Sequence, residues 1–201
     1  FDPPLGRVSA DQAVINGMAE KLGDRIFRDE LDLLPEHSAE LHLPFIQYLF
    51  GDVPVVVGLV PDPLIPMIED DGKRVSTDEL TSALREVLEE VGGLTYFVSS
   101  ADLSHVGPQF GEPKPVDDDR KMEVERHDRE HLAKFLENDS KGFLEAMEWC
   151  KNQTRWCSIG NMSAIGTLVS ADSIELIDYR QASDDRGAQM VSVASIAFLE
   201  K

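Results

Sequence analysis

Two side chains that could carry acid–base chemistry, Asp102 and His105, stand three residues apart directly after an apolar run. A carboxylate that accepts an imidazole N–H fixes the tautomer of the ring and raises its basicity, which suits a general base or a group that supports a metal ligand. In open α/β sheets such groups lie in loops beyond the carboxyl ends of strands. The sequence therefore predicts a functional loop here; a loop in which Asp102 only caps a turn is the alternative.

Two other places have side chains of the same chemical kind. Glu36, His37 and Ser38 combine a carboxylate, an imidazole and a hydroxyl, and their spacing fits a functional cluster and a simple helix cap beside an exposed histidine equally well. Cys157 precedes a predicted helix N-terminus, where partial positive charge lowers the pKa of a thiol and favours a thiolate that binds metal or acts as a nucleophile. A small buried hydrophobe is the alternative for Cys157 and the preferred interpretation of Cys150.

The segment His127 to His131 reads His-Asp-Arg-Glu-His and matches the His-x-x-Glu-His pattern of some zinc peptidases. Two histidines four residues apart lie on one face of a helix, as zinc binding requires. However, the surrounding sequence from Arg120 to Lys134 is dense in charge, and both histidines flank the apolar positions of the helix. We therefore interpret the match as a coincidence and predict a solvated helix face.

The elements that must position these residues follow from caps and hydrophobic periodicity. Capping boxes begin at Ser9 and Ser76. Helices are predicted over about 10–22, 44–50, 76–91, 117–138, 140–151 and 162–169. Strands are predicted over about 53–60, 95–101, 173–180 and 189–199. A helix, a short glycine turn and an apolar strand in succession are typical of crossover connections, so we expect an α/β fold with a largely parallel or mixed central sheet and helices on both faces.

Length and composition limit the class of protein. A chain of 201 residues with 42% hydrophobic content predicts a single domain over residues 1–201. The net charge of −19 excludes nucleic acid as an expected partner, because phosphate binding needs a basic patch. No apolar run approaches the roughly 20 residues that span a bilayer, and the two cysteines do not form a Cys-x-x-Cys pair, so we expect a cytoplasmic protein without a membrane partner.

Three phrases in this order resemble the Memo family. They are Glu-His-Ser-Ala-Glu-Leu-His-Leu-Pro-Phe at 36–45, Ser-Ser-Ala-Asp-Leu-Ser-His-Val-Gly at 99–107, and Cys157 before an apolar helix. The first six residues and the closing strand also fit, so the resemblance covers essentially the whole chain. It implies the α/β fold of the LigB-type class III extradiol dioxygenases. Because Phe1 falls in mid-phrase, we expect that the beginning of the domain is missing.

The resemblance implies a metal centre that holds iron or copper, with zinc also compatible with the ligand types. Cys157 would be its thiolate ligand, Asp102 and His105 would line the same pocket, and His37 would lie close by. Two features depart from the family. The other metal histidines belong to upstream Pro-His-Ala-Gly and Gly-Pro-Ser-His phrases that this chain lacks, and Ser158 stands where the family often has glycine.

Two functions are therefore expected as alternatives. One is a non-haem metal-dependent oxidoreductase, dioxygenase-like, in which His105 moves protons for a small-molecule substrate. The other is a signalling adaptor that uses the same pocket, with its helix N-termini, to bind an acidic or phosphorylated peptide. Metal bound through Cys157 would favour the enzyme, whereas partner binding that is insensitive to chelators would favour the adaptor. The sequence assigns no oligomeric state.

Overall fold

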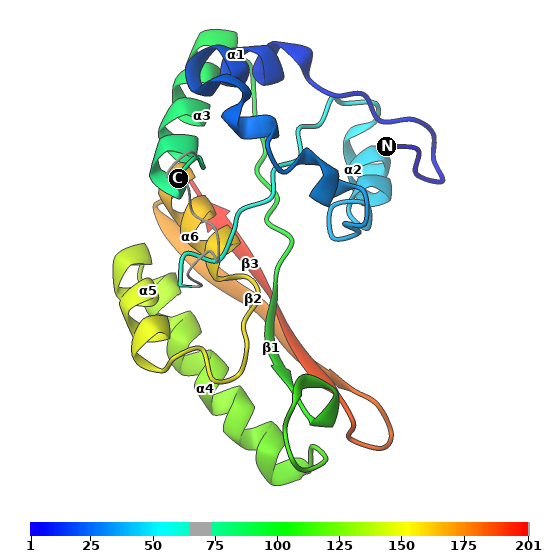
Figure 1. The fold of residues 1–201 in the computed structure, drawn as a ribbon, viewed down its shortest axis with the longest axis vertical. Coiled ribbons are helices and arrows are strands. Elements are labelled where there is room, and N and C mark those ends of the chain that lie inside the picture. The colour runs from blue at the N-terminus through cyan, green and yellow to red at the C-terminus, as the bar shows by residue number, and fades with distance from the viewer. Residues whose placement is uncertain (65–73, 201) are drawn as a thin grey trace. The chain divides into compact units, whose positions relative to one another are not determined.

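A computed structural model describes residues 1–64 and 74–200 of the chain. The chain forms two compact units, one comprising Phe1–Pro61 with Ile65–Ser100 and the other Asp62–Leu64 with Ala101–Lys201 (Figure 1). Each unit has a hydrophobic core of its own. Among the described residues, none of the helices combines the length and the apolar character that crossing a membrane requires.

The first unit is helical. It contains α1 (Gln12–Leu22), α2 (Leu43–Phe50) and α3 (Thr77–Val91), with 3-10 turns at Gly23–Phe27 and Glu30–Leu33. Its core forms between α1 and α3 from the buried residues Val14, Met18, Ala83 and Val87. These two helices approach closely at Gly17, where an added Cβ would lie 2.8 Å from a Val87 methyl group.

Capping boxes were predicted at the starts of α1 and α3, and the structure has one of the two. At α3, the Ser76 side chain accepts from the Glu79 backbone N–H at 3.2 Å, and Glu79 accepts in return from the Ser76 N–H at 3.0 Å, so that capping box is confirmed. At α1, the cap is Asp11, whose carboxylate accepts from the Ala13 N–H at 3.0 Å. The predicted box at Ser9 is wrong, because a carboxylate two residues later satisfies the free N–H groups.

The capping carboxylate of α3 predicts a pH dependence. The Ser76 backbone N–H and then the Arg25 guanidinium lower the pKa of Glu79 from 4.5 to about 2. Because the pKa is depressed in the folded state, its stabilising contribution is complete above about pH 4.5 and is lost as the pH falls toward 2. We expect Glu79→Gln to flatten the acid side of the stability curve over this range in urea denaturation, while Glu89→Gln, an exposed control on the same helix, leaves it unchanged. Equal slopes for Glu79→Gln and wild type would contradict this expectation.

Two apolar runs that were predicted to be strands are not strands in the described structure. Within 53–60, Val55 makes one isolated parallel bridge, to Ala10. Residues 95–101 do not form a strand, and Tyr96 and Val98 expose 65% and 57% of their surface. An apolar run forms a strand only where another strand pairs with its backbone groups. The predictions of strands over 53–60 and 95–101 are therefore wrong.

The second unit contains a three-stranded antiparallel sheet. Its strands are β1 (Asp102–Val106), β2 (Ser173–Ser183) and β3 (Met190–Leu199), in the order β1-β3-β2. The turn between β2 and β3 closes with the Gly187 N–H donating to the Asp184 carbonyl at 3.1 Å. The α/β class is thus observed, but this sheet is antiparallel rather than largely parallel, because a tight hairpin joins its two longest strands.

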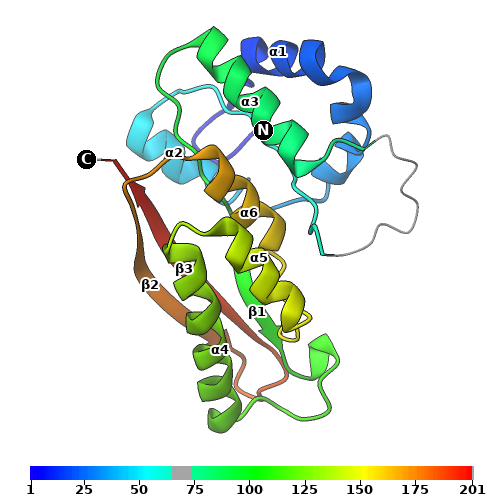
Figure 2. The same ribbon diagram turned by 90° about the vertical axis from the view of Figure 1, so that its left-hand side faces the viewer.

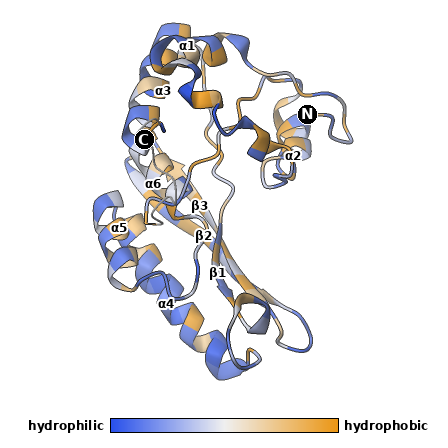
Figure 3. Cartoon of the chain, in the orientation of Figure 1, coloured by the Kyte–Doolittle hydropathy of each residue, from blue (hydrophilic) through white to orange (hydrophobic). Residues whose placement is uncertain are grey.

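Helices α4 (Asp118–Leu136), α5 (Ser140–Trp149) and α6 (Ile159–Leu168) complete the second unit, with a 3-10 turn at Pro108–Phe110. Figures 1 and 2 show all three helices on the same side of the sheet, so the expected covering of both faces is not seen within this unit. The core between helices and sheet is formed mainly by Leu103, Leu132, Phe135, Phe143, Met147, Trp156, Ile159, Met162 and Ile174. Figure 3 shows α4 as largely hydrophilic, although its inner face reaches this core.

Candidate functional site

A buried carboxylate on α4 ties the segments of the candidate site together. Asp128 is fully buried, and each of its oxygens accepts two hydrogen bonds. Oδ1 accepts from Ser104 Oγ at 2.5 Å and from Trp156 Nε1 at 2.9 Å. Oδ2 accepts from Ser192 Oγ at 2.5 Å and from Tyr179 OH at 2.8 Å. The four donors come from β1, β2, β3 and the loop before α6, so one side chain links all of these segments to α4.

Burial alone would raise the pKa of Asp128, but the side-chain hydrogen bonds to the carboxylate outweigh burial and leave the pKa below its ordinary value of 3.8. Burial, next the hydrogen bond to Asp128 and then the negative charge of Asp128 raise the pKa of Tyr179, so the phenol stays protonated and continues to donate. The network therefore fixes Ser104, which lies between Asp102 and His105, and Trp156, which directly precedes Cys157.

Backbone carbonyls hold the His105 ring. Its Nδ1 lies 3.0 Å from the Leu103 carbonyl oxygen and 3.1 Å from that of Arg155. Carbonyl oxygens only accept, so Nδ1 carries the proton and Nε2 of the neutral ring has a free lone pair. Nε2 is 3.7 Å from Asp102 Oδ2, a distance of ion-pair contact rather than of a hydrogen bond. The carbonyls thus set the tautomer, and Asp102 faces the nitrogen that remains available for chemistry.

Cys157 stands at the entrance to α6, one residue before the N-cap Ser158. Its side chain is exposed, and Sγ lies 3.9 Å from the backbone carbonyl oxygen of Asp102. The loop before it is held by Asn152, whose side-chain amide donates to the Trp156 carbonyl at 2.8 Å and accepts from the Trp156 N–H at 2.7 Å. Possible ligand atoms of Asp102, His105 and Cys157 all lie within 4.8 Å of one another.

This group supplies three kinds of donor: a carboxylate oxygen, an imidazole nitrogen and a sulfur. Sulfur and imidazole ligands together suit copper, iron and zinc, so the donor set fits the metals that the resemblance implies. Contrary to the expected loop, Asp102 and His105 lie on strand β1, where pairing with β3 fixes their backbone. The structure therefore brings Asp102, His105 and Cys157 together, with Asp102 and His105 on a strand instead of in a loop.

His37 belongs to the first unit, in the turn that precedes α2. Its side chain is 81% exposed, and Nδ1 lies 4.0 Å from Glu36 Oε1. The same carboxylate oxygen accepts from the Ser38 backbone N–H at 2.6 Å, and this hydrogen bond lowers the pKa of Glu36. Within the first unit, Glu36 therefore acts as the local cap of a turn, with an exposed histidine beside it.

The histidines of α4 do not lie on a solvated face. His131 exposes 9% of its surface, the His127 side chain exposes 19%, and their rings lie 6.1 and 6.4 Å from that of Trp156. The earlier interpretation of 127–131 is wrong in this respect. Val124, Asp128, His131 and Phe135 follow one another at helical spacing and are all buried, so the same periodicity could have identified both Asp128 and His131 as inward-facing.

Comparison with known proteins identifies the family of the chain. The model of the Memo-like protein family matches residues 1–198. A MEMO1 family protein of Caldivirga maquilingensis is 30% identical over 203 residues, which cover 98% of this chain and 64% of that protein. One from Pyrobaculum aerophilum is 28% identical over 206 residues, with 98% and 64% coverage, and one from Methanopyrus kandleri is 26% identical over 205, with 97% and 62%. This chain thus spans slightly less than two thirds of the length of these relatives, and it belongs to the Memo-like protein family.

Proposed function

We propose that the chain provides part of the metal site of a non-haem metal-dependent oxidoreductase, dioxygenase-like in its chemistry, that acts on a small-molecule substrate. The observation that supports this proposal best is the convergence of Asp102, His105 and Cys157 within 4.8 Å. As part of the same proposal, the complete protein has the fold of the LigB-type class III extradiol dioxygenases. Support for the fold comes from membership of the Memo-like family.

In this proposal, Cys157 is the thiolate ligand of the metal. Iron or copper, when bound, would supply one-electron chemistry that no protein side chain of the site provides. Zinc would also fit the ligand types. The exposed position of Cys157 and the 52% exposure of the Asp102 side chain leave the site open to a small substrate. The histidine ligands expected from the resemblance are not among the residues of this chain.

His105 is assigned the role of proton carrier. Its Nε2 takes a proton from the substrate, while Nδ1 keeps its own proton and its two carbonyl partners. The positive charge that then forms on the ring lies 3.7 Å from the Asp102 carboxylate, which stabilises it. His37 is proposed as a further group of the site in the complete protein, as the resemblance implies.

Metal analysis of the full-length protein tests this proposal. After anaerobic reconstitution with Fe(II) or Cu(I) and removal of free metal, we expect about one equivalent bound per chain in wild type and almost none in Cys157→Ala. His105→Ala should retain the metal and lose turnover, whereas His42→Ala, a matched histidine control outside the site, should keep both. Full-length protein that stays free of iron and copper would contradict the proposal. Partner binding that persists in the presence of chelators would then favour a peptide-binding adaptor.

A further inference from the structure

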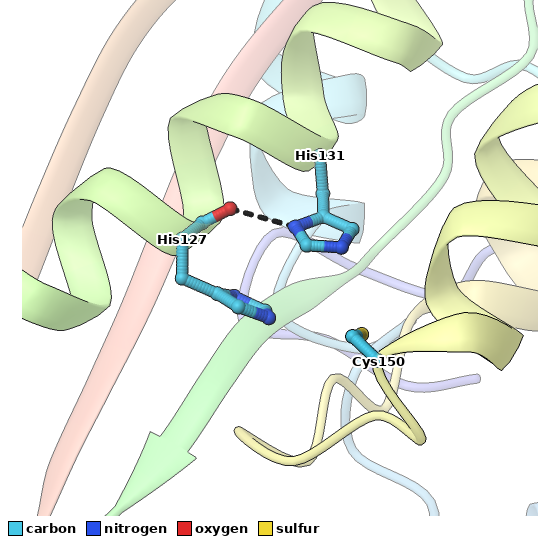
Figure 4. A group of neighbouring side chains, drawn as sticks. All are labelled: His127, His131 and Cys150. Atoms are coloured by element: carbon cyan, nitrogen blue, oxygen red, sulfur yellow. Dashed lines mark hydrogen bonds between the residues drawn. The ribbon is translucent and has the colours of Figure 1, made fainter.

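We infer that His127, His131 and Cys150 form a second metal site, which shares no residue with the first, and that this site binds zinc. All three lie in the second unit, the histidines on α4 and the cysteine directly after the last residue of α5. Their possible ligand atoms all lie within 4.8 Å of one another. Figure 4 shows both imidazole rings on the same side of α4, with Cys150 facing them from the end of α5.

Hydrogen bonds at Nδ1 prepare both rings for metal binding through Nε2. His131 Nδ1 donates to the His127 backbone carbonyl at 2.8 Å, the contact drawn in Figure 4, so Nε2 of a neutral His131 carries a lone pair. His127 Nδ1 lies 3.3 Å from Thr154 Oγ1 and 3.5 Å from the buried Asp128 carboxylate. Ligand histidines in zinc sites usually have such an oxygen on the nitrogen that faces away from the metal.

The remaining nitrogen of His127 gives independent evidence for a ligand. His127 Nε2 is buried and has no hydrogen-bond partner among the described residues. A buried polar atom without a partner lowers the stability of the folded state, and native proteins rarely leave one. A metal ion bound to Nε2 would remove this cost, because the nitrogen lone pair would then be engaged.

The possible ligand atoms lie at most slightly farther apart than the ligand atoms of a bound tetrahedral zinc ion. The two rings are neighbours, 4.2 Å apart between centroids and inclined by 31°. Zinc bonds of about 2.0–2.1 Å to nitrogen and 2.3 Å to sulfur place ligand atoms roughly 3.3–3.7 Å apart. Since the ligand atoms lie within 4.8 Å of one another, they need to approach by at most about 1–1.5 Å. Cys150 can contribute by exchanging its contact with the Met147 carbonyl oxygen, at 3.3 Å, for the metal.

Two imidazoles and one thiolate suit zinc, which has no geometric preference of its own and accepts a water molecule as fourth ligand. Met147 contacts Cys150, and Trp156 lies beside both histidine rings. Both residues are buried in the core, so the ion would be shielded from solvent on the side that faces them. Zinc bound here would connect α4 to the end of α5. It would therefore stabilise the second unit in proportion to its occupancy.

Zinc titration of the full-length Cys157→Ala variant against a chromophoric chelator tests the inference without the thiol of the proposed oxidoreductase site. We expect one equivalent of zinc that is lost when Cys150→Ser or His131→Asn is added. Adding Thr154→Val should weaken binding by about 10-fold, since it removes a partner of a ligand histidine. Adding His42→Asn is the matched control and should change nothing. Absence of zinc binding in Cys157→Ala, or binding unaffected by both ligand substitutions, would overturn the inference.

Alkylation of the Cys150 thiol provides a second test that leaves all three ligands in place. In the Cys157→Ala protein, zinc at ten times its Kd should slow alkylation at Cys150, followed by peptide mass spectrometry, by about 10-fold. An unchanged rate at saturating zinc would overturn the inference, as would protection by Cu(I) alone. Because Cys157 is absent throughout, either result is independent of whether iron or copper binds at the first site.

Discussion

Asp128→Asn is expected to lower the free energy of unfolding of the second unit by about 3 kcal/mol. The substitution keeps the size of the side chain but replaces one acceptor oxygen with an NH₂ group. Whichever oxygen is replaced, two donors lose this acceptor: Ser104 Oγ with Trp156 Nε1, which then keeps only Ser104 Oγ as a partner, or Ser192 Oγ with Tyr179 OH. The remaining oxygen also loses its negative charge, which weakens the other two hydrogen bonds.

Urea denaturation at neutral pH measures this loss, with Glu130→Gln on the exposed side of the same helix as control. The pKa of Asp128 is depressed in the folded state, so its contribution is complete above the ordinary pKa of 3.8 and disappears as the pH falls through the lower folded value. The difference between wild type and Asp128→Asn should therefore shrink in acid. A difference below about 0.5 kcal/mol at pH 7, the range of neutral surface changes, would show that the network does not hold the site.

Trp156→Ala is expected to cost about 3–5 kcal/mol in unfolding free energy. The indole exposes 1% of its surface, lies in the main core cluster of the second unit and packs 6.0 Å from the Phe143 ring. Its Nε1 also donates to Ser104 Oγ and Asp128 Oδ1, both at 2.9 Å, so the substitution creates a cavity and removes a donor from the buried network.

The other tryptophan of the chain is a matched control. Trp149 exposes 90% of its surface at the end of α5, and Trp149→Ala should change stability by less than about 0.5 kcal/mol. Denaturation should be followed by circular dichroism, since each substitution removes a fluorophore. Similar losses for Trp149→Ala and Trp156→Ala would mean that the core is not organised around Trp156.

The helices could be predicted from the sequence because their signals are local. The Ser76 and Glu79 box, the acidic start of α4 and the glycine after α2 each act within one turn of the helix that they delimit. The strands of the β2–β3 hairpin were predicted for a related reason, since one short turn joins them in sequence.

Sheet pairing and the second histidine cluster could not be predicted in the same way. The partner of β1 is β3, which begins more than 80 residues later in the sequence. The sequence of a run such as 95–101 does not reveal whether another strand will pair with it. Cys150 approaches His127 and His131 only because α4 and α5 pack together. The grouping of Asp102, His105 and Cys157 could be predicted because the family resemblance implies that these three residues line one pocket. In the structure they lie close together.

The most direct test of the proposed oxidoreductase site is X-ray absorption spectroscopy of the anaerobically reconstituted full-length protein at the edge of the bound metal. We predict one sulfur ligand beside nitrogen or oxygen ligands in wild type, retained in Cys150→Ser and lost in Cys157→Ala. A bound iron or copper without a sulfur ligand, or a sulfur signal that survives Cys157→Ala, would contradict the assignment of Cys157 as the metal thiolate.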